Sequence, residues 1–104
     1  MGSNLKHVTL DIFTSPRLNL YESSDGFSVE VVSRTDLLYH EAGRQMFVDS
    51  ELLTGPFGMA VYKDTIQKWE PPYDRVPVTD LDRDRILNNI RDAFRSQGFE
   101  IDVL

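Results

Sequence analysis

The sequence predicts an α+β protein: a mostly antiparallel β-sheet with one amphipathic helix near the C-terminus packed on one face, followed by a terminal strand. Three observations lead to this fold class. Short runs of alternating apolar and polar residues fill most of the chain, one late segment repeats its apolar residues at helical spacing, and a last alternating run follows it. The 104 residues suit a single domain, residues 1–104, of which the polar start 1–4 is expected to be flexible.

Three alternating runs are predicted before residue 32. The run Leu5–Phe13 is typical of a half-buried strand, and Ser15-Pro16 is expected to end it. A second, shorter run starts at Leu18 and ends before Asp25-Gly26, a strong turn signal. The third run is Phe27–Val31.

A hairpin is predicted over Leu37–Val48, turning at Ala42-Gly43, because glycine tolerates the positive φ of a tight turn. Leu37, Tyr39 and Glu41 lead into this turn, and the chain returns through Met46 and Val48, with Phe47 on the other face. Residues 50–54 are ambiguous. Residues 55–58 are predicted as a turn and 59–62 as a strand.

Residues 64–69 fit two alternatives, one helical turn that Asp64 caps or a further strand over 65–69. Residues 70–78 hold three prolines and are predicted as a connection.

A helix is predicted over residues 79–97. The pattern Thr79-x-x-Asp82 is a helix-start signature, and Gly98 suits the C-terminal end. The apolar stripe at helical spacing is Ile86, Leu87, Ile90, Ala93 and Phe94. Leu81 falls off this stripe, so it should pack elsewhere or stay partly exposed. Residues 99–103 alternate as a last strand, a candidate parallel neighbour of strand 59–62.

The charge argues against nucleic acid as a partner. Seventeen acids and eleven Lys and Arg give a net charge of −6, spread evenly, so no basic face is available for phosphates. The sequence contains neither an apolar run of the length of a membrane helix nor a cysteine. We therefore expect no membrane association and a reducing compartment, the cytoplasm.

Catalytic and metal signals are weak. His7 and His40 are the two histidines, and a zinc site needs three or four ligands at good geometry. The serines lie mostly at turns, outside any nucleophile motif, and the glycines form no phosphate-binding pattern. A glycosidase needs only two carboxylates, and among seventeen acids such a pair is expected by chance, so the acids do not specifically indicate this activity. We predict no catalytic residues, no metal and no cofactor.

The stretch GPFGMAVYKDTIQKWEPP, residues 55–72, contains the one tryptophan of the chain. Met59, Val61 and Trp69 are expected to be part of the core, since Trp69 is the largest apolar side chain available to close it. Phe57, Glu70 and Tyr73 are the predicted partner-binding residues, because glycines and prolines hold them in loops that a partner can reach.

Three motifs carry a family resemblance. Residues 39–51 hold a Tyr-x-Glu-x-Gly-Arg hairpin followed by a small residue and Glu; residues 58–69 hold a Gly-hydrophobic-Tyr strand that runs to Trp; residues 86–90 hold Ile-x-x-Asn-Ile. In order and spacing they resemble the immunity protein 74 family of bacterial polymorphic toxin systems, over about residues 27–104. The resemblance implies a small α+β protein that binds and neutralises a cognate protein toxin, without catalysis or cofactor.

Two hypotheses of other classes stay open. The first is a structural or regulatory interaction domain that forms a homodimer through an exposed strand edge. The second is a small enzyme with dispersed acids, which a cleft with two or three converging ionisable groups would favour.

Overall fold

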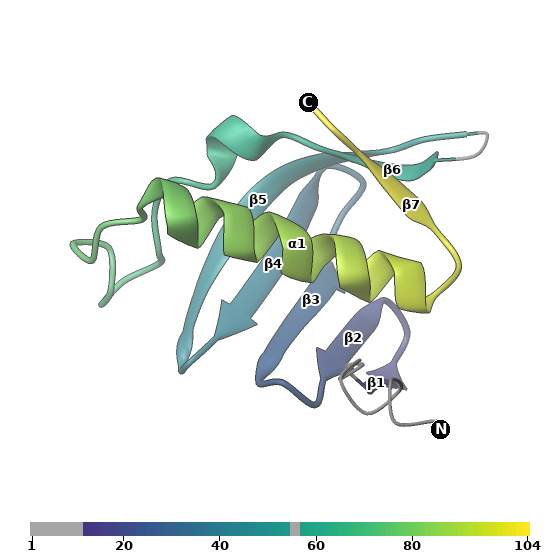
Figure 1. The fold of residues 1–104 in the computed structure, drawn as a ribbon, viewed down its shortest axis with the longest axis horizontal. Coiled ribbons are helices and arrows are strands. Elements are labelled where there is room, and N and C mark those ends of the chain that lie inside the picture. Colours follow the sequence, from purple (N-terminus) through teal and green to yellow (C-terminus); the bar gives the residue numbers. More distant parts are fainter. Residues whose placement is uncertain (1–11, 55–56) are drawn as a thin grey trace, which may run out of the picture.

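The computed structural model describes residues 12–54 and 57–104. Its strands form one sheet in the order β1-β2-β3-β4-β5-β6-β7, which is also the order of the chain (Figure 1). The elements are β1 (Phe13–Arg17), β2 (Leu20–Ser23), β3 (Phe27–Val31), β4 (Asp36–Glu41), β5 (Arg44–Leu52), β6 (Phe57–Val61), η2 (Lys63–Thr65), α1 (Asp80–Ser96) and β7 (Glu100–Val103). Among these residues, no helix combines the length and apolar character that crossing a membrane requires.

The sheet is antiparallel from β1 to β6, and β7 pairs with β6 in parallel. A parallel neighbour needs a crossover, and here α1 supplies it. The helix lies across the inner face of the curled sheet (Figure 1). The predicted fold class is confirmed, as is the predicted parallel pair.

The β4–β5 hairpin is the predicted one. Leu37 faces Val48 and Tyr39 faces Met46 across the pair, and all four side chains are buried. The two turn residues, Ala42 and Gly43, have φ values of 50° and 77°. Two consecutive positive φ values match the twist of a two-residue hairpin, and glycine adopts them without steric cost.

The core lies between this inner face and α1. The whole predicted helix stripe is buried, whereas Leu81 is 81% exposed. The sheet and the connection supply most of the remaining core residues, which are Phe27, Val29, Leu37, Tyr39, Met46, Val48, Met59, Val61, Ile66, Trp69 and Ile101. The inward prediction for Met59, Val61 and Trp69 is therefore confirmed.

The start of α1 has the predicted cap. The Thr79 side chain accepts a hydrogen bond from the Asp82 backbone N–H at 3.1 Å, and the Asp82 carboxylate accepts one from the Thr79 backbone N–H at 3.0 Å. This reciprocal capping box satisfies two backbone donors that the helix leaves free. The Thr79 N–H and then Arg85 lower the pKa of Asp82 to about 2. At the other end Gln97 is the C-cap, and Gly98 follows it at a φ of 87°.

Local expectations at the sheet margins were wrong. Ser15-Pro16 does not end a strand but lies inside β1, with a register shift between Thr14 and Arg17. An edge strand tolerates proline, because one side of its backbone has no partner strand. Leu18 does not start β2; it lies in the turn before it, 85% exposed.

The segment around β6 also differs from expectation. Strand β6 begins at Phe57 rather than Met59, and β5 extends to Leu52 through part of the ambiguous stretch. The short 3-10 helix η2 occupies 63–65, and residues 66–70 form neither a helix nor a strand. The predicted strand Leu5–Phe13 falls almost wholly outside the described residues.

Candidate partner-binding surface

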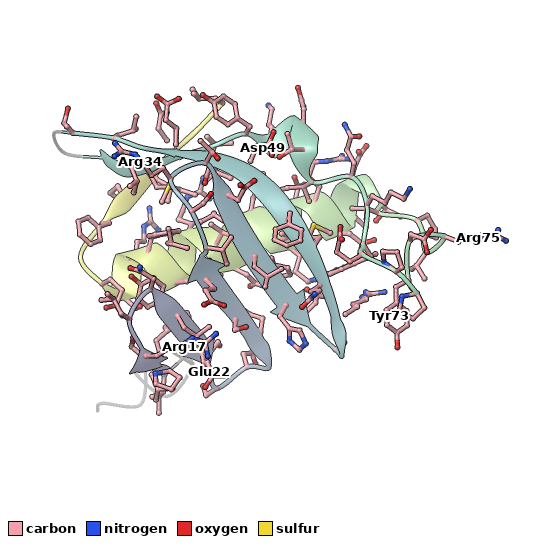
Figure 2. All side chains as sticks on the ribbon, turned by 180° about the vertical axis from the view of Figure 1, so that it is seen from behind. Arg17, Glu22, Arg34, Asp49, Tyr73 and Arg75 are labelled. Atoms are coloured by element: carbon pink, nitrogen blue, oxygen red, sulfur yellow. The ribbon has the colours of Figure 1, made fainter. Side chains whose placement is uncertain are left out.

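No element of residues 12–54 and 57–104 covers the face of the sheet opposite α1, which is seen in front in Figure 2. Residues on this outer face stand directly opposite one another across neighbouring strands. One such row is polar: Thr14, Glu22, Ser28, His40 and Gln45. A second row is mixed: Arg17, Leu20, Glu30, Leu38 and Phe47. Phe47 is 46% exposed there, which confirms that it points away from the core.

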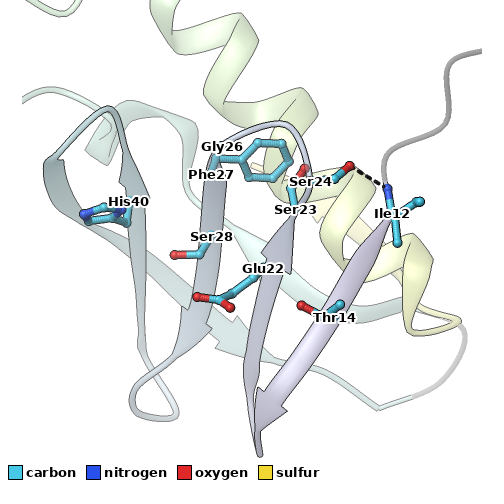
Figure 3. Close-up of a pocket in the computed structure, with 9 residues that line it drawn as sticks. All are labelled: Ile12, Thr14, Glu22, Ser23, Ser24, Gly26, Phe27, Ser28 and His40. Atoms are coloured by element: carbon cyan, nitrogen blue, oxygen red, sulfur yellow. Dashed lines mark hydrogen bonds between the residues drawn. The ribbon is translucent and has the colours of Figure 1, made fainter.

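The polar row brings a serine, a histidine and a carboxylate together at an open cavity of about 430 Å³ (Figure 3). Ser28 stands between Glu22 and His40, and no hydrogen bond among the described residues joins these side chains. A nucleophile needs its base beside it and the acid behind that base. Here Glu22 stands beside Ser28, on the side away from His40, so the row lacks the geometry of a triad.

The segment after η2 is bound to the β4–β5 hairpin near its turn. Trp69 is 1% exposed, and the Glu70 backbone N–H donates to the Gln45 carbonyl oxygen at 2.8 Å. Two further backbone hydrogen bonds follow. The Tyr73 N–H donates to the Glu70 carbonyl oxygen and the Val76 N–H donates to the Tyr73 carbonyl oxygen, both at 3.0 Å. Buried tryptophan and backbone bonds thus hold a surface loop in one position.

The three predicted partner-binding residues lie in different surroundings. Tyr73 is 40% exposed, at the margin of the outer face (Figure 2), and Glu70 is half-buried in the same loop. The Phe57 backbone begins β6, but its side chain lies outside the described part of the chain. Figure 1 shows the start of β6 and the loop before α1 at opposite ends of the molecule. The structure therefore brings Glu70 and Tyr73 together but not Phe57.

A polar network that the sequence did not predict joins the hairpin to α1. The Tyr39 hydroxyl donates to Glu41 Oε1 at 2.6 Å and accepts from Asn89 Nδ2 at 2.8 Å. Arg85 donates through Nη2 to Glu41 Oε2 at 2.8 Å and through Nη1 to Asp82 Oδ1 at 2.7 Å. Burial, and then the bond to Glu41, raise the pKa of Tyr39 above its usual range. Because the Tyr39 hydroxyl keeps its proton, it can donate to Glu41 while it accepts from Asn89, and it thereby links the hairpin to α1.

The network continues to the tryptophan. Arg44 Nη2 lies 3.6 Å from Glu41 Oε2, and the Arg44 guanidinium carbon lies 4.2 Å from the centre of the Trp69 ring, a cation–π distance. The Tyr39 and Trp69 rings are 6.4 Å apart between centres. Glu41 is the residue whose sequence position could have indicated this network, because it alternates with apolar residues that face the core. A buried carboxylate is costly unless it has a partner, so a partner was to be expected.

Metal ligation finds no support among residues 12–54 and 57–104. They hold no group of three or more His, Asp or Glu side chains arranged to bind an ion. His40 is exposed on the outer face, and His7 lies outside the described residues.

The network also unites the motifs on which the family resemblance rests, since Tyr39, Glu41 and Arg44 come from the first, Trp69 from the second and Asn89 from the third. A comparison with protein-family models matches residues 28–104 to Immunity protein 74, Imm74. Comparisons with curated proteins and with solved structures found no match. The matched range covers 77 of the 104 residues, about three-quarters of the sequence. The chain therefore belongs to the immunity protein 74 family.

Proposed function

We propose that this protein protects its producer by binding a cognate protein toxin and neutralising it, without catalysing a reaction. The observation that carries the proposal is the family match over residues 28–104. An immunity protein is named for protection against a toxin, and stoichiometric binding is the direct way for a small domain to provide it.

The outer face supports a role in binding rather than in catalysis. The side chains of Glu22, Ser28 and His40 share one row, but Glu22 stands beside Ser28 and not behind His40, so this carboxylate cannot orient the histidine as a base. The described elements leave this sheet face uncovered, and the loop holding Tyr73 adjoins it at Gln45. A broad surface of this kind suits contact with another protein.

We infer that Glu70 and Tyr73 contact the toxin, with Phe57 as a separate candidate at the other end of the molecule. Tyrosine covers much area with little loss of side-chain entropy, which is why it is frequent among energetically dominant interface residues. Tyr73 is accessible on a loop whose backbone is already held by hydrogen bonds, so binding would order little further chain.

Co-expression tests the proposal. The candidate toxin is the C-terminal domain of a large protein encoded next to this chain, produced under an inducible promoter in a susceptible host. We expect the immunity protein to restore growth and to co-elute with the toxin domain in size-exclusion chromatography. A family member from a different toxin locus serves as the control. Growth arrest that persists despite abundant, folded immunity protein, with no complex on the column, would refute the proposal. The same column gives the oligomeric state of the protein alone and thereby tests the homodimer prediction.

A further inference from the structure

The outer face of the sheet has an apolar pair in the middle of its β4–β5 hairpin. Leu38 and Phe47 stand directly opposite each other across the two strands. Leu38 is half-buried, whereas Phe47 is 46% exposed. A phenylalanine in this position keeps apolar surface in contact with water, so a partner that covers the ring gains from its burial.

Polar side chains surround this pair on the same face. His40 and Gln45 form the next outward pair on the side of the hairpin turn. Asp36 and Asp49 form the next outward pair on the other side, and Glu30 follows on the neighbouring strand β3. An exposed aromatic side chain within a polar rim is the usual arrangement at the energetic centre of a protein interface.

The apolar pair adjoins the loop that holds Tyr73. Gln45 and Phe47 are alternate residues of β5, so their side chains point to the same face of the sheet. The Gln45 carbonyl oxygen accepts from the Glu70 N–H, and this bond fixes the start of the Tyr73 loop beside the same part of β5. The pair and the loop therefore border one continuous surface (Figure 2).

The outward-facing residues of β1–β5 carry mostly negative charge. Five of them are acids and one is a base, namely Glu22, Glu30, Asp36, Asp49, Glu51 and Arg17. Their net charge is −4, whereas the rest of the sequence, with twelve acids and ten Lys and Arg, carries −2. Arg34 stands at the margin, in the turn between β3 and β4 (Figure 2). The negative charge of the chain is thus concentrated around the apolar pair.

This charge decides what kind of partner can cover the apolar pair. A face of net negative charge repels nucleic acid and anionic membranes. A second copy that docked through the same face would place like charges opposite one another, because a twofold interface brings identical patches together. A protein surface rich in lysine and arginine is attracted instead.

We propose that the toxin docks on this outer face through a basic surface whose apolar centre covers Phe47. The inference rests on the proposed function and names the surface and the chemistry of its partner. The open cavity of Figure 3 lies in the adjacent polar row and has Glu22 on its wall, so a lysine or arginine side chain of the toxin finds a hollow beside a carboxylate. Burial of Phe47 slows dissociation, and the acids accelerate association by electrostatic steering.

Surface plasmon resonance with the toxin domain encoded next to this chain tests the apolar contact. Phe47→Ala is compared with Phe99→Ala, a residue of the same type and similar exposure, 49%, in the connection between α1 and β7. We expect Phe47→Ala to bind about tenfold or more weakly, chiefly through faster dissociation, and Phe99→Ala to bind as wild type. Amide NMR spectra of the free variants check that both are folded. Undiminished affinity of folded Phe47→Ala would overturn the proposal.

A charge-matched pair of variants tests the basic character of the partner. Glu22→Lys with Asp49→Lys brings the net charge of the face from −4 to zero. Asp84→Lys with Asp92→Lys makes the same change at exposed positions on α1, on the other side of the sheet. We expect the outer-face variant to associate about tenfold more slowly at low salt and to lose most of the salt dependence of its association rate, with a much smaller change in the α1 variant. Equal slowing in both variants would show that total charge rather than this face steers the toxin, against the proposal.

The remaining outcomes separate this inference from the proposed function. A wild type that binds the toxin domain, with no loss in either outer-face variant, would reject this surface and leave the proposed function standing. A wild type that does not bind the toxin domain would reject the proposed function, and this inference with it. A wild-type dimer that Phe47→Ala converts to a monomer in size-exclusion chromatography would place a second copy on the face and overturn the proposal.

Discussion

The two faces of the sheet differ in how completely their side chains are buried. On the inner face, apolar residues of β3, β4, β5 and β6 pack against one stripe of α1, and two polar side chains at this interface, Tyr39 and Glu41, are bonded to Asn89 and Arg85. On the outer face Phe47 is half-exposed, and at the far end of β5 four carboxylates line a cavity that no lysine or arginine of the described residues lines. The inner face is buried by the chain itself, whereas the outer regions keep side chains accessible to a partner.

The largest expected effect lies at Trp69, where both the core and the polar network meet. Trp69→Ala should lower the free energy of unfolding by about 3–5 kcal/mol, because it opens a cavity and removes the ring beneath Arg44. Phe47→Ala, on the outer face, should cost about 1 kcal/mol or less. Urea unfolding of both variants provides the measurement. Equal losses of unfolding free energy in the two variants would contradict the distinction between a buried inner face and an exposed outer face.

The helix stripe gives the next largest effect. Ile90→Ala should cost about 2–5 kcal/mol, since Ile90 is fully buried against the sheet. Leu81→Ala, on the same helix but 81% exposed, should change stability by no more than about 0.5 kcal/mol. A loss below about 1 kcal/mol for Ile90→Ala in chemical denaturation would mean that the stripe does not face the core.

The capping box should contribute less. Thr79→Ala removes the acceptor of the Asp82 N–H and should cost about 1 kcal/mol. Thr79→Ser keeps a hydroxyl at the cap and should recover most of the loss. If serine is no better than alanine in thermal melts, the cap does not stabilise α1 through this hydrogen bond.

Asp82 makes a smaller, pH-dependent contribution. Its folded-state pKa of about 2 lies below its ordinary value of 3.8, so the ionised form favours the folded state. This stabilisation is fully present above about pH 4 and is lost as the pH falls toward 2. Asp82→Asn should therefore be less stable than wild type at pH 7, with the gap narrowing over that acidic range. A gap that stays constant from pH 7 to pH 2 would contradict this origin.

Tyr73 should have almost no effect on folding and a selective one on binding. Tyr73→Ala is expected to stay within about 0.5 kcal/mol of wild type in stability, because the ring is exposed at 40%. It should weaken toxin binding by about 1 kcal/mol or more. Val76→Ala, in the same loop and 37% exposed, is the matched control for calorimetric titration. Unchanged binding for Tyr73→Ala would move the contact to the outer sheet face.

Local patterns predicted the elements that local chemistry determines. Alternation marked the β4–β5 hairpin, Ala42-Gly43 marked its turn, and a 3.6-residue stripe with a Thr-x-x-Asp start marked α1. The same patterns were wrong at β1, where Pro16 is tolerated only because the strand is an edge. Whether a strand is an edge depends on the order of all strands, which no window of a few residues contains.

The candidate sites depended still more on tertiary structure. The sequence by itself determined the fold class, the inward positions of Trp69 and the helix stripe, and the placement of Tyr73 in a proline-rich loop. Only the folded chain decided that Tyr39, Glu41 and Asn89 meet, and that Asp36, Asp49 and Asp64 share one cavity. Periodicity assigns each residue to a face of its own element, but which faces come together follows from strand order, sheet curl and the path of α1, and these are settled by packing across the whole domain.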